Sequence, residues 1–280
     1  MRDTRDMLLV LLSSLLMLTG CSRRDILDDY PVSGVEISLD WNGVTNKLPE
    51  GVRVIFYPKN AEGRKIDTYL SVKGGKVKVP PGRYSVVVYN YDTETVQIRG
   101  EEAYETIEAF TGHCNGLGIA GTEQLVWGPD PLYVVRIDDL KIENSEEELQ
   151  LNWKPKLVVK TYSFKLKVQG LEYVSSIVGS IEGMSSCYDL GLGCGKAGDS
   201  PIYFAARGSA GEVTGSFTVF GTSEGVISRA GNAIKLTLAF VKTDNKVQKM
   251  EVDITEVIAN SESGGSGGDD DGDEPFKEIE

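Results

Sequence analysis

The chain has 280 residues and a formal net charge of −13, with 42 acidic residues against 29 basic ones and a single histidine. This acidic balance is a poor match to nucleic acid or to anionic lipid head groups, which would repel it. A single histidine also excludes most histidine-dependent catalysis, because imidazole is the usual general base near neutral pH.

Residues 1–20 have the pattern of a bacterial lipoprotein signal. An apolar run at 7–18 is too short to span a bilayer as a helix. It ends in Leu18-Thr19-Gly20-Cys21, where the cysteine thiol would be lipidated and the chain cut just before it. We therefore predict a signal peptide at 1–20 and covalent lipid on Cys21, whose acyl chains would hold the protein on a membrane. An ordinary secretory signal cut at another small residue is the alternative.

The residues after Cys21 predict a tether and then a series of short strands. Residues 21–31 are polar and lack periodicity, whereas 35–41 alternate strictly, with Val, Ile, Leu and Trp on one face. Such alternation is typical of a half-buried strand. Further strand-like runs lie at 52–57, 76–79, 83–90, 133–137, 148–153, 162–168, 175–181, 202–206, 212–220, 234–241 and 247–254.

Short strands at this spacing favour an all-β protein made of two β-sandwiches in tandem. Trp153-Lys154-Pro155 resembles a boundary, so we assign one sandwich to 32–154 and the other to 155–260. Residues 80–82, Pro-Pro-Gly, predict a type II turn that joins 76–79 and 83–90 as a hairpin. Residues 101–110 place apolar side chains near helical spacing, so a short helix is an option there.

The C-terminal segment is strongly acidic. Residues 261–280 contain eight acidic residues and one lysine, which gives them a net charge of −7. Most of the remainder is Gly and Ser, which cannot bury enough apolar surface to fold. We therefore predict a disordered acidic tail over 261–280.

The motifs that could carry enzyme chemistry lack their structural context. The Gly-x-Gly-x-x-Gly match at 116–121 has no clear strand before it or helix after it. The phosphate-loop-like segment at 191–196 is followed by Ala where Ser or Thr must bind magnesium. A nucleophile-elbow match at 221–225 has no later histidine, and EF-hand-like spacing at 269–280 lacks the position-6 glycine. We therefore predict a protein that is not an enzyme, with no catalytic residue, cofactor or metal.

Three cysteines remain after Cys21. Outside the cytoplasm cysteines commonly pair, so Cys187 and Cys194 are a possible disulfide that would close a small loop and contribute roughly 2–3 kcal/mol. A bridge from Cys114 to either would instead tie the two halves together. His113 and the three cysteines could also form a zinc site, or the thiols could stay free, and free or partly paired thiols are favoured.

The three tryptophans differ in their expected exposure. Trp41 and Trp153 lie on the apolar faces of predicted strands, so we expect both in a core. Trp127 stands beside Gly128-Pro129 and could form an exposed platform on which a sugar ring stacks. It is our candidate for ligand contact.

The chain also resembles a known family. Four segments carry the resemblance: Cys21 with its tether, Leu48-Pro49-Glu50-Gly51, Pro80-Pro81-Gly82-Arg83-Tyr84 and, later, Gly179-Ser180-Ile181-Glu182-Gly183. They are similar to segments of the fimbrillin-like lipoproteins of Bacteroidota, which are relatives of the anchor and accessory subunits of type V pili. The resemblance covers about residues 21–258. It implies two transthyretin-like Greek-key sandwiches, attachment to the outer membrane on its periplasmic or its outer side, and fimbrial subunits or other surface proteins as partners.

Two features favour an anchor or accessory subunit over a shaft subunit. Shaft subunits of such pili are trimmed after an early strand, but the loop at 42–48 contains Lys47 and no arginine. The C-terminal end is Gly- and Asp-rich, not an alternating apolar segment able to complete a neighbour's sheet. The resemblance therefore implies a non-enzymatic role in fimbrial anchoring or adhesion. A surface lipoprotein that binds a glycan or another ligand is the alternative.

Overall fold

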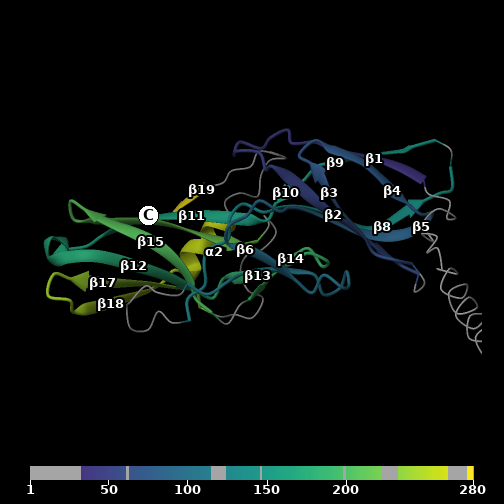
Figure 1. The fold of residues 1–280 in the computed structure, drawn as a ribbon. Helices are drawn as coiled ribbons and strands as arrows, with labels where there is room; N and C mark the ends of the chain where they lie inside the picture. Colours follow the sequence, from purple (N-terminus) through teal and green to yellow (C-terminus); the bar gives the residue numbers. More distant parts are fainter. Residues whose placement is uncertain are drawn as a thin grey trace, which may run out of the picture.

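The computed structural model describes residues 33–60, 63–114, 124–145, 147–197, 200–221, 233–263 and 276–279. These residues form three β-sheets, and the predicted all-β class is confirmed (Figure 1). The helices described are a 3₁₀-helix, Leu171–Tyr173, and α2, Thr255–Ser263. Neither they nor any other helix in these ranges has the length and apolarity needed to cross a membrane.

The first sheet has eight strands in the order β10-β8-β5-β2-β3-β4-β1-β9. Their bounds are β1 Ser33–Leu39, β2 Gly51–Pro58, β3 Ile66–Ser71, β4 Gly74–Val79, β5 Gly82–Asn90, β8 Tyr133–Ile142, β9 Leu149–Trp153 and β10 Lys156–Leu157. Strand β1 is antiparallel to β4 and parallel to β9.

This sheet encloses a core because it folds over between β3 and β4. The two strands share one register pair, Ser71 with Gly74, where the chain turns the corner. Gly74 has a φ of 98°, and a Cβ there would lie 2.0 Å from the carbonyl oxygen of Ile37, so only glycine fits. Alternate side chains of the two layers meet inside: Val35, Ile37, Val52, Val54, Phe56, Val77, Val79, Val86, Val88 and Trp153.

Both tryptophans expected in a core are found there. Trp153 is 9% exposed, and Trp41 packs against the same cluster half-buried. The indole Nε1 of Trp41 donates to the carbonyl oxygen of Val72 at 2.6 Å, so its polar atom is satisfied at the core's edge.

The predicted hairpin of 76–79 with 83–90 is wrong. β4 pairs with β1, while β5 pairs with β2 and β8. The chain crosses at Pro80-Pro81 from one layer to the other, and the Tyr84 hydroxyl donates to the Pro80 carbonyl at 2.9 Å beside the crossing. Turn residues predict that the chain changes direction, but the buried faces of both strands decide which partner each one takes.

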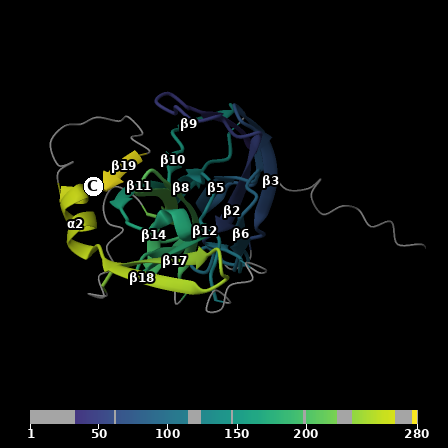
Figure 2. The same cartoon turned by 90° about the vertical axis from the view of Figure 1, so that its left-hand side faces the viewer.

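The second large sheet has seven strands in the order β18-β17-β12-β15-β16-β11-β19. Their bounds are β11 Val159–Lys167, β12 Val174–Glu182, β15 Ile202–Ser209, β16 Glu212–Phe220, β17 Lys235–Lys242, β18 Val247–Asp253 and β19 Phe276–Ile279. Its core is aromatic at the centre, where Tyr162 and Phe217 stack with ring centroids 5.4 Å apart. Helix α2 lies along one side (Figure 2) and contributes Ile258, which is fully buried one helical turn after Ile254.

Part of the predicted disordered tail has secondary structure. Helix α2 continues to Ser263, and β19 pairs in parallel with β11. Residues 264–275 lie outside the described ranges. An exposed strand edge offers main-chain hydrogen bonds whatever side chains arrive, so composition alone does not reveal such pairing.

A third sheet takes two strands from each half of the chain. Its strands are β6 Val96–Arg99, β7 Glu108–Thr111, β13 Ser185–Asp189 and β14 Cys194–Ala197, in the order β14-β13-β7-β6. Strands β7 and β13 join the halves, since Phe110 pairs with Cys187 and Glu108 with Asp189. We call this the shared sheet, and Figure 1 shows it between the two larger sheets.

The inner face of the shared sheet packs on the first sheet and forms a third core. This core combines residues of both halves: Ile55, Tyr57, Val87, Tyr89, Ile107, Ala109, Leu132, Tyr188, Leu190 and Phe220. The helix considered for 101–110 is wrong, because turns precede β7 there and side chains then alternate between the sheet's two faces. The sandwich bounds 32–154 and 155–260 stay a prediction.

Candidate functional site: a pocket on the shared sheet

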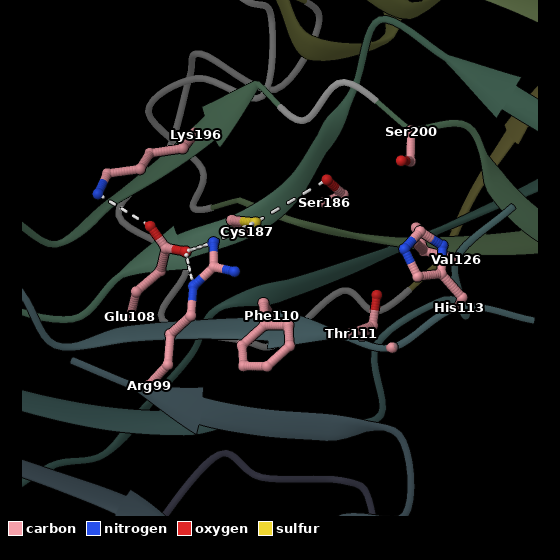
Figure 3. A pocket seen from close by; sticks show the side chains of 11 residues that line it. Arg99, Glu108, Phe110, Thr111, His113, Val126, Ser186, Cys187, Lys196 and Ser200 are labelled. Carbon is pink, nitrogen blue, oxygen red and sulfur yellow. Dashed lines mark hydrogen bonds and ion pairs between the residues drawn. The ribbon is translucent and has the colours of Figure 1, made fainter. Parts of the chain in front are cut away.

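The outer face of the shared sheet carries a pocket of about 390 Å³ (Figure 3). Because side chains alternate along a strand, this face receives the residues that the inner core does not use. Val126 and the segment 112–113 complete the wall. The polar side chains that line the pocket are Arg99, Glu108, Thr111, His113, Ser186, Lys196 and Ser200.

Glu108 is the centre of the charged groups. Strand register places it opposite Arg99 on β6 and Asp189 on β13. One carboxylate oxygen accepts a hydrogen bond from Arg99 Nε at 2.8 Å, and the other accepts one from Lys196 Nζ at 3.0 Å. The same Nζ lies 2.8 Å from a carboxylate oxygen of Asp189. Two cations and two carboxylates therefore neutralise one another.

These ion pairs keep the groups charged at neutral pH. Burial alone would raise the pKa of Glu108, whose side chain is 11% exposed, but hydrogen bonds from Lys196 and Arg99 outweigh it and lower this pKa. Hydrogen bonds to Asp189 and Glu108 raise the pKa of Lys196. Neither group is therefore poised to transfer a proton near pH 7.

Phe110 and Cys187 supply the less polar part of the wall. The guanidinium carbon of Arg99 lies 4.5 Å from the centroid of the Phe110 ring, a cation–π contact. Arg99 Nη2 lies 3.9 Å from Cys187 Sγ. Burial raises the pKa of the Cys187 thiol, which makes it a poor nucleophile at neutral pH.

Thr111, at the end of β7, is the unusual residue of the pocket. It is 6% exposed, and its Oγ1 has no hydrogen-bond partner in the described part of the chain. Figure 3 shows this hydroxyl between Phe110 and the His113 imidazole. Leaving a buried hydroxyl unpaired costs about 1–3 kcal/mol. Because this oxygen is also enclosed, it is not open to a ligand in the pocket and lowers the stability of the fold instead.

Cys114, Cys187 and Cys194 are free thiols in the structure. The register of β13 on β14 pairs Cys187 with Lys196 and Cys194 with Asp189, and the possible Cys187–Cys194 disulfide stays a prediction. Cys114 is buried next to the exposed His113. Within the described ranges, no three His, Cys, Asp or Glu side chains gather as metal ligands, so the zinc site considered above is not assembled there.

The remaining residues singled out from the sequence have different positions. Cys21 lies outside the described residues. Trp127 is 38% exposed and packs edge-to-face on Tyr203, with ring centroids 5.4 Å apart. Its backbone N–H donates to the Gly112 carbonyl at 3.0 Å, so Trp127 adjoins the wall of the pocket.

Sequence reasoning missed Arg99, Glu108, Thr111 and Lys196. Arg99 on β6 and Glu108 on β7 face each other across consecutive strands, whereas Lys196 on β14 reaches them only through the long-range pairing of β7 with β13. The alternation of polar and apolar residues over 96–99 was the one signal that could have marked part of this face.

Comparison with known proteins gives a family and close relatives. Residues 20–205 match the family described as "Domain of unknown function (DUF5119)". A Bacteroides ovatus protein named "Putative fimbrium anchoring subunit Fim4B" is 62% identical over 96% of this chain and 84% of its own length. These findings confirm the resemblance to Bacteroidota fimbrial proteins.

Solved structures share the fold. The crystal structure of a "putative adhesin" from Bacteroides ovatus is 58% identical, covers 94% of each chain and superposes with a TM-score of 0.79. The fimbrial anchor protein Mfa2 from Porphyromonas gingivalis is 12% identical, covers 81% of this chain and 84% of its own, and has a TM-score of 0.54, so it shows the fold alone. The family match spans well over half of the sequence, and the chain therefore belongs to the DUF5119 family.

Proposed function

We propose that this protein is a non-enzymatic, lipid-anchored surface subunit that attaches a fimbrium to the cell. The observation that carries the proposal is the 62% identity, over 96% of the chain, to a protein named as a fimbrium anchoring subunit. At this identity and coverage the two chains share their fold, so a shared assembly role is the simplest inference.

The lipid anchor rests on Cys21. The family match begins at residue 20, directly before this cysteine, which is where the mature chain would start after cleavage. The first described strand begins at Ser33, twelve positions after Cys21. A short tether of this kind would hold the first sheet close to the outer membrane.

A non-enzymatic role agrees with the chemistry of the pocket. Its acidic and basic groups are held in ion pairs, and the pKa of Cys187 is raised. The described part of the chain contains no metal-binding cluster of His, Cys, Asp or Glu. The net charge of −13 further favours protein partners over nucleic acid.

The test is a Cys21→Ala variant in the native host, with Cys194→Ala as the matched control at an exposed thiol. Cys21→Ala should move the protein from the membrane fraction to the soluble fraction, and fimbriae should be shed or lengthened in electron micrographs. Cys194→Ala should change neither. Membrane retention of Cys21→Ala would contradict the lipid anchor, and unchanged fimbriae on cells that release the protein would contradict the anchoring role.

A further inference from the structure

The shared sheet covers only part of the face of the first sheet on which it packs. Ile55 and Val87 on this face are fully buried in the third core. Two positions before Ile55 along β2, Arg53 lies on the same face, and the strand register places it between Tyr69 on β3 and Tyr89 on β5. Here the face reaches the surface of the protein, because Tyr69 is 60% exposed.

Two exposed tyrosine rings meet on this uncovered part of the face. Tyr69 and Tyr91 lie edge to face with ring centroids 5.3 Å apart, and Tyr91 is 45% exposed. The Tyr91 ring can extend over β2 because Gly51 has no side chain, since a Cβ there would lie 2.7 Å from Tyr91 Oη. Single exposed apolar residues are ordinary, but paired tyrosines are of the kind that carries binding energy at protein interfaces.

Arg53 supports the rings and is itself neutralised. Its guanidinium carbon lies 5.6 Å from the centroid of the Tyr69 ring and 5.9 Å from that of Tyr89, which are cation–π contacts. Its nitrogens donate to the Asp67 carboxylate at 2.9 and 2.7 Å and also pair with Glu101. Tyr69 is therefore held in place before any partner arrives, which lowers the entropy cost of binding.

The charge beside the rings selects the kind of partner. Asp92 directly follows Tyr91, and its carboxylate accepts the backbone N–H of Glu50 at 2.9 Å, so two exposed acidic residues lie next to the tyrosine pair. Neither has an ion-pair partner in the part of the chain that the structure describes. An acidic segment would be repelled here, whereas a cationic side chain could contact an aromatic face and a carboxylate together.

We propose that Tyr69, Tyr91, Glu50 and Asp92 form a docking surface for an arginine-bearing segment of a partner protein. A guanidinium of the partner would lie on the part of the Tyr69 and Tyr91 rings that Arg53 leaves open, and its charge would be balanced by Glu50 and Asp92. Arginine fits better than lysine, because its planar group stacks on aromatic rings and is less strongly hydrated. The surface does not depend on the anchoring role, because it specifies the chemistry of a partner and not its identity.

The experiment is an NMR titration of the chain from residue 22 onward, with isotope-labelled tyrosine rings; this chain keeps every described residue. The probe is the capped peptide Gly-Arg-Gly-Arg-Gly. In the comparison peptides each arginine is replaced by glutamate or by citrulline, which has the shape of arginine without its charge. The arginine peptide should shift the ring signals of Tyr69 and Tyr91 and bind about threefold more tightly than the citrulline peptide, and added salt should weaken it.

Matched variants locate the binding on this surface. Tyr69→Leu and Tyr91→Leu keep an apolar side chain and remove the aromatic face, so each should weaken the arginine peptide about threefold. Glu50→Gln should weaken it about twofold. Tyr173→Leu, at a tyrosine of the second half that is 62% exposed, should leave binding unchanged. Circular dichroism and thermal unfolding confirm that each variant folds.

Three results would overturn the proposal. The first is that neither ring signal shifts with the arginine peptide. The second is that the citrulline or the glutamate peptide binds as tightly, because the surface would then suit a neutral or an acidic partner. The third is that Tyr69→Leu and Tyr91→Leu weaken binding no more than Tyr173→Leu, because the peptide would then bind elsewhere.

Discussion

Leu190→Ala should destabilise both halves of the protein together. Leu190 follows β13, is fully buried, and packs in the core formed by residues of both halves. Its backbone N–H donates to the Ile107 carbonyl at 3.0 Å, and the substitution leaves that bond in place. The free energy of unfolding should therefore fall by about 3 kcal/mol, the usual cost of losing a buried leucine side chain and leaving a cavity. For a chain of this size the midpoint temperature of thermal unfolding should fall by roughly 6–12 °C.

The assay is differential scanning calorimetry of the chain from residue 22, and the control is Leu192→Ala. Leu192 lies two residues further on and is 63% exposed, so its substitution should change stability by no more than about 0.5 kcal/mol. Because the shared sheet couples the halves, Leu190→Ala should shift one cooperative transition as a whole. If the protein instead showed two unfolding transitions and only one of them shifted, the coupling between the halves would be refuted. If the midpoint temperature shifted no more than in Leu192→Ala, the packing argument would be refuted.

Three further predictions each concern a particular kind of side chain. Thr111→Val should raise the free energy of unfolding by about 1 kcal/mol in urea titrations, because it removes an unpaired buried hydroxyl. If the free energy of unfolding fell by a similar amount instead, the hydroxyl would have a hydrogen-bond partner. Maleimide labelling with mass mapping should modify exposed Cys194 first and Cys114 last, since burial raises the pKa of Cys114 to about 11; equal rates would contradict this order. A hydrogen bond from Arg53 lowers the pKa of Asp67 on folding, so its stabilisation is present above about pH 4 and is lost as the pH falls further. Asp67→Asn should therefore cost up to about 1 kcal/mol at pH 7 and less at pH 3, and a cost that does not change with pH would argue against the pair.

Strand positions could be predicted where one face of the strand is buried and the other is exposed to solvent. The alternation in 35–41 reappears as β1, where Val35 and Ile37 are buried and Ser38 is exposed. The run at 212–220 corresponds to β16, Glu212–Phe220. In both cases the local pattern and the tertiary environment agree, so the periodicity of the sequence was sufficient to predict the strand.

The shared sheet could not be predicted because nothing local requires it. Its strands have four or five residues each, and the glycines around Leu192 favour a loop when 191–196 is considered alone. What makes β13 extended is its pairing with β7, between residues such as Phe110 and Cys187 that lie far apart in the sequence. The same difficulty applies to the pocket, because Lys196 and Asp189 become neighbours of Glu108 only through that pairing.

The two faces of the shared sheet link stability to the pocket. Leu190 on the inner side lies in a core made by both halves, while Glu108 on the outer side holds Arg99 from the first half and Lys196 from the second. Separating the halves would break the β7–β13 pairing, expose that core and dismantle the charged network in one step. A subunit that holds a fibre bears load between its attachment and its cargo. A load passed from one half of the chain to the other would be borne in part by the β7–β13 pairing and by the ion pair between Glu108 and Lys196.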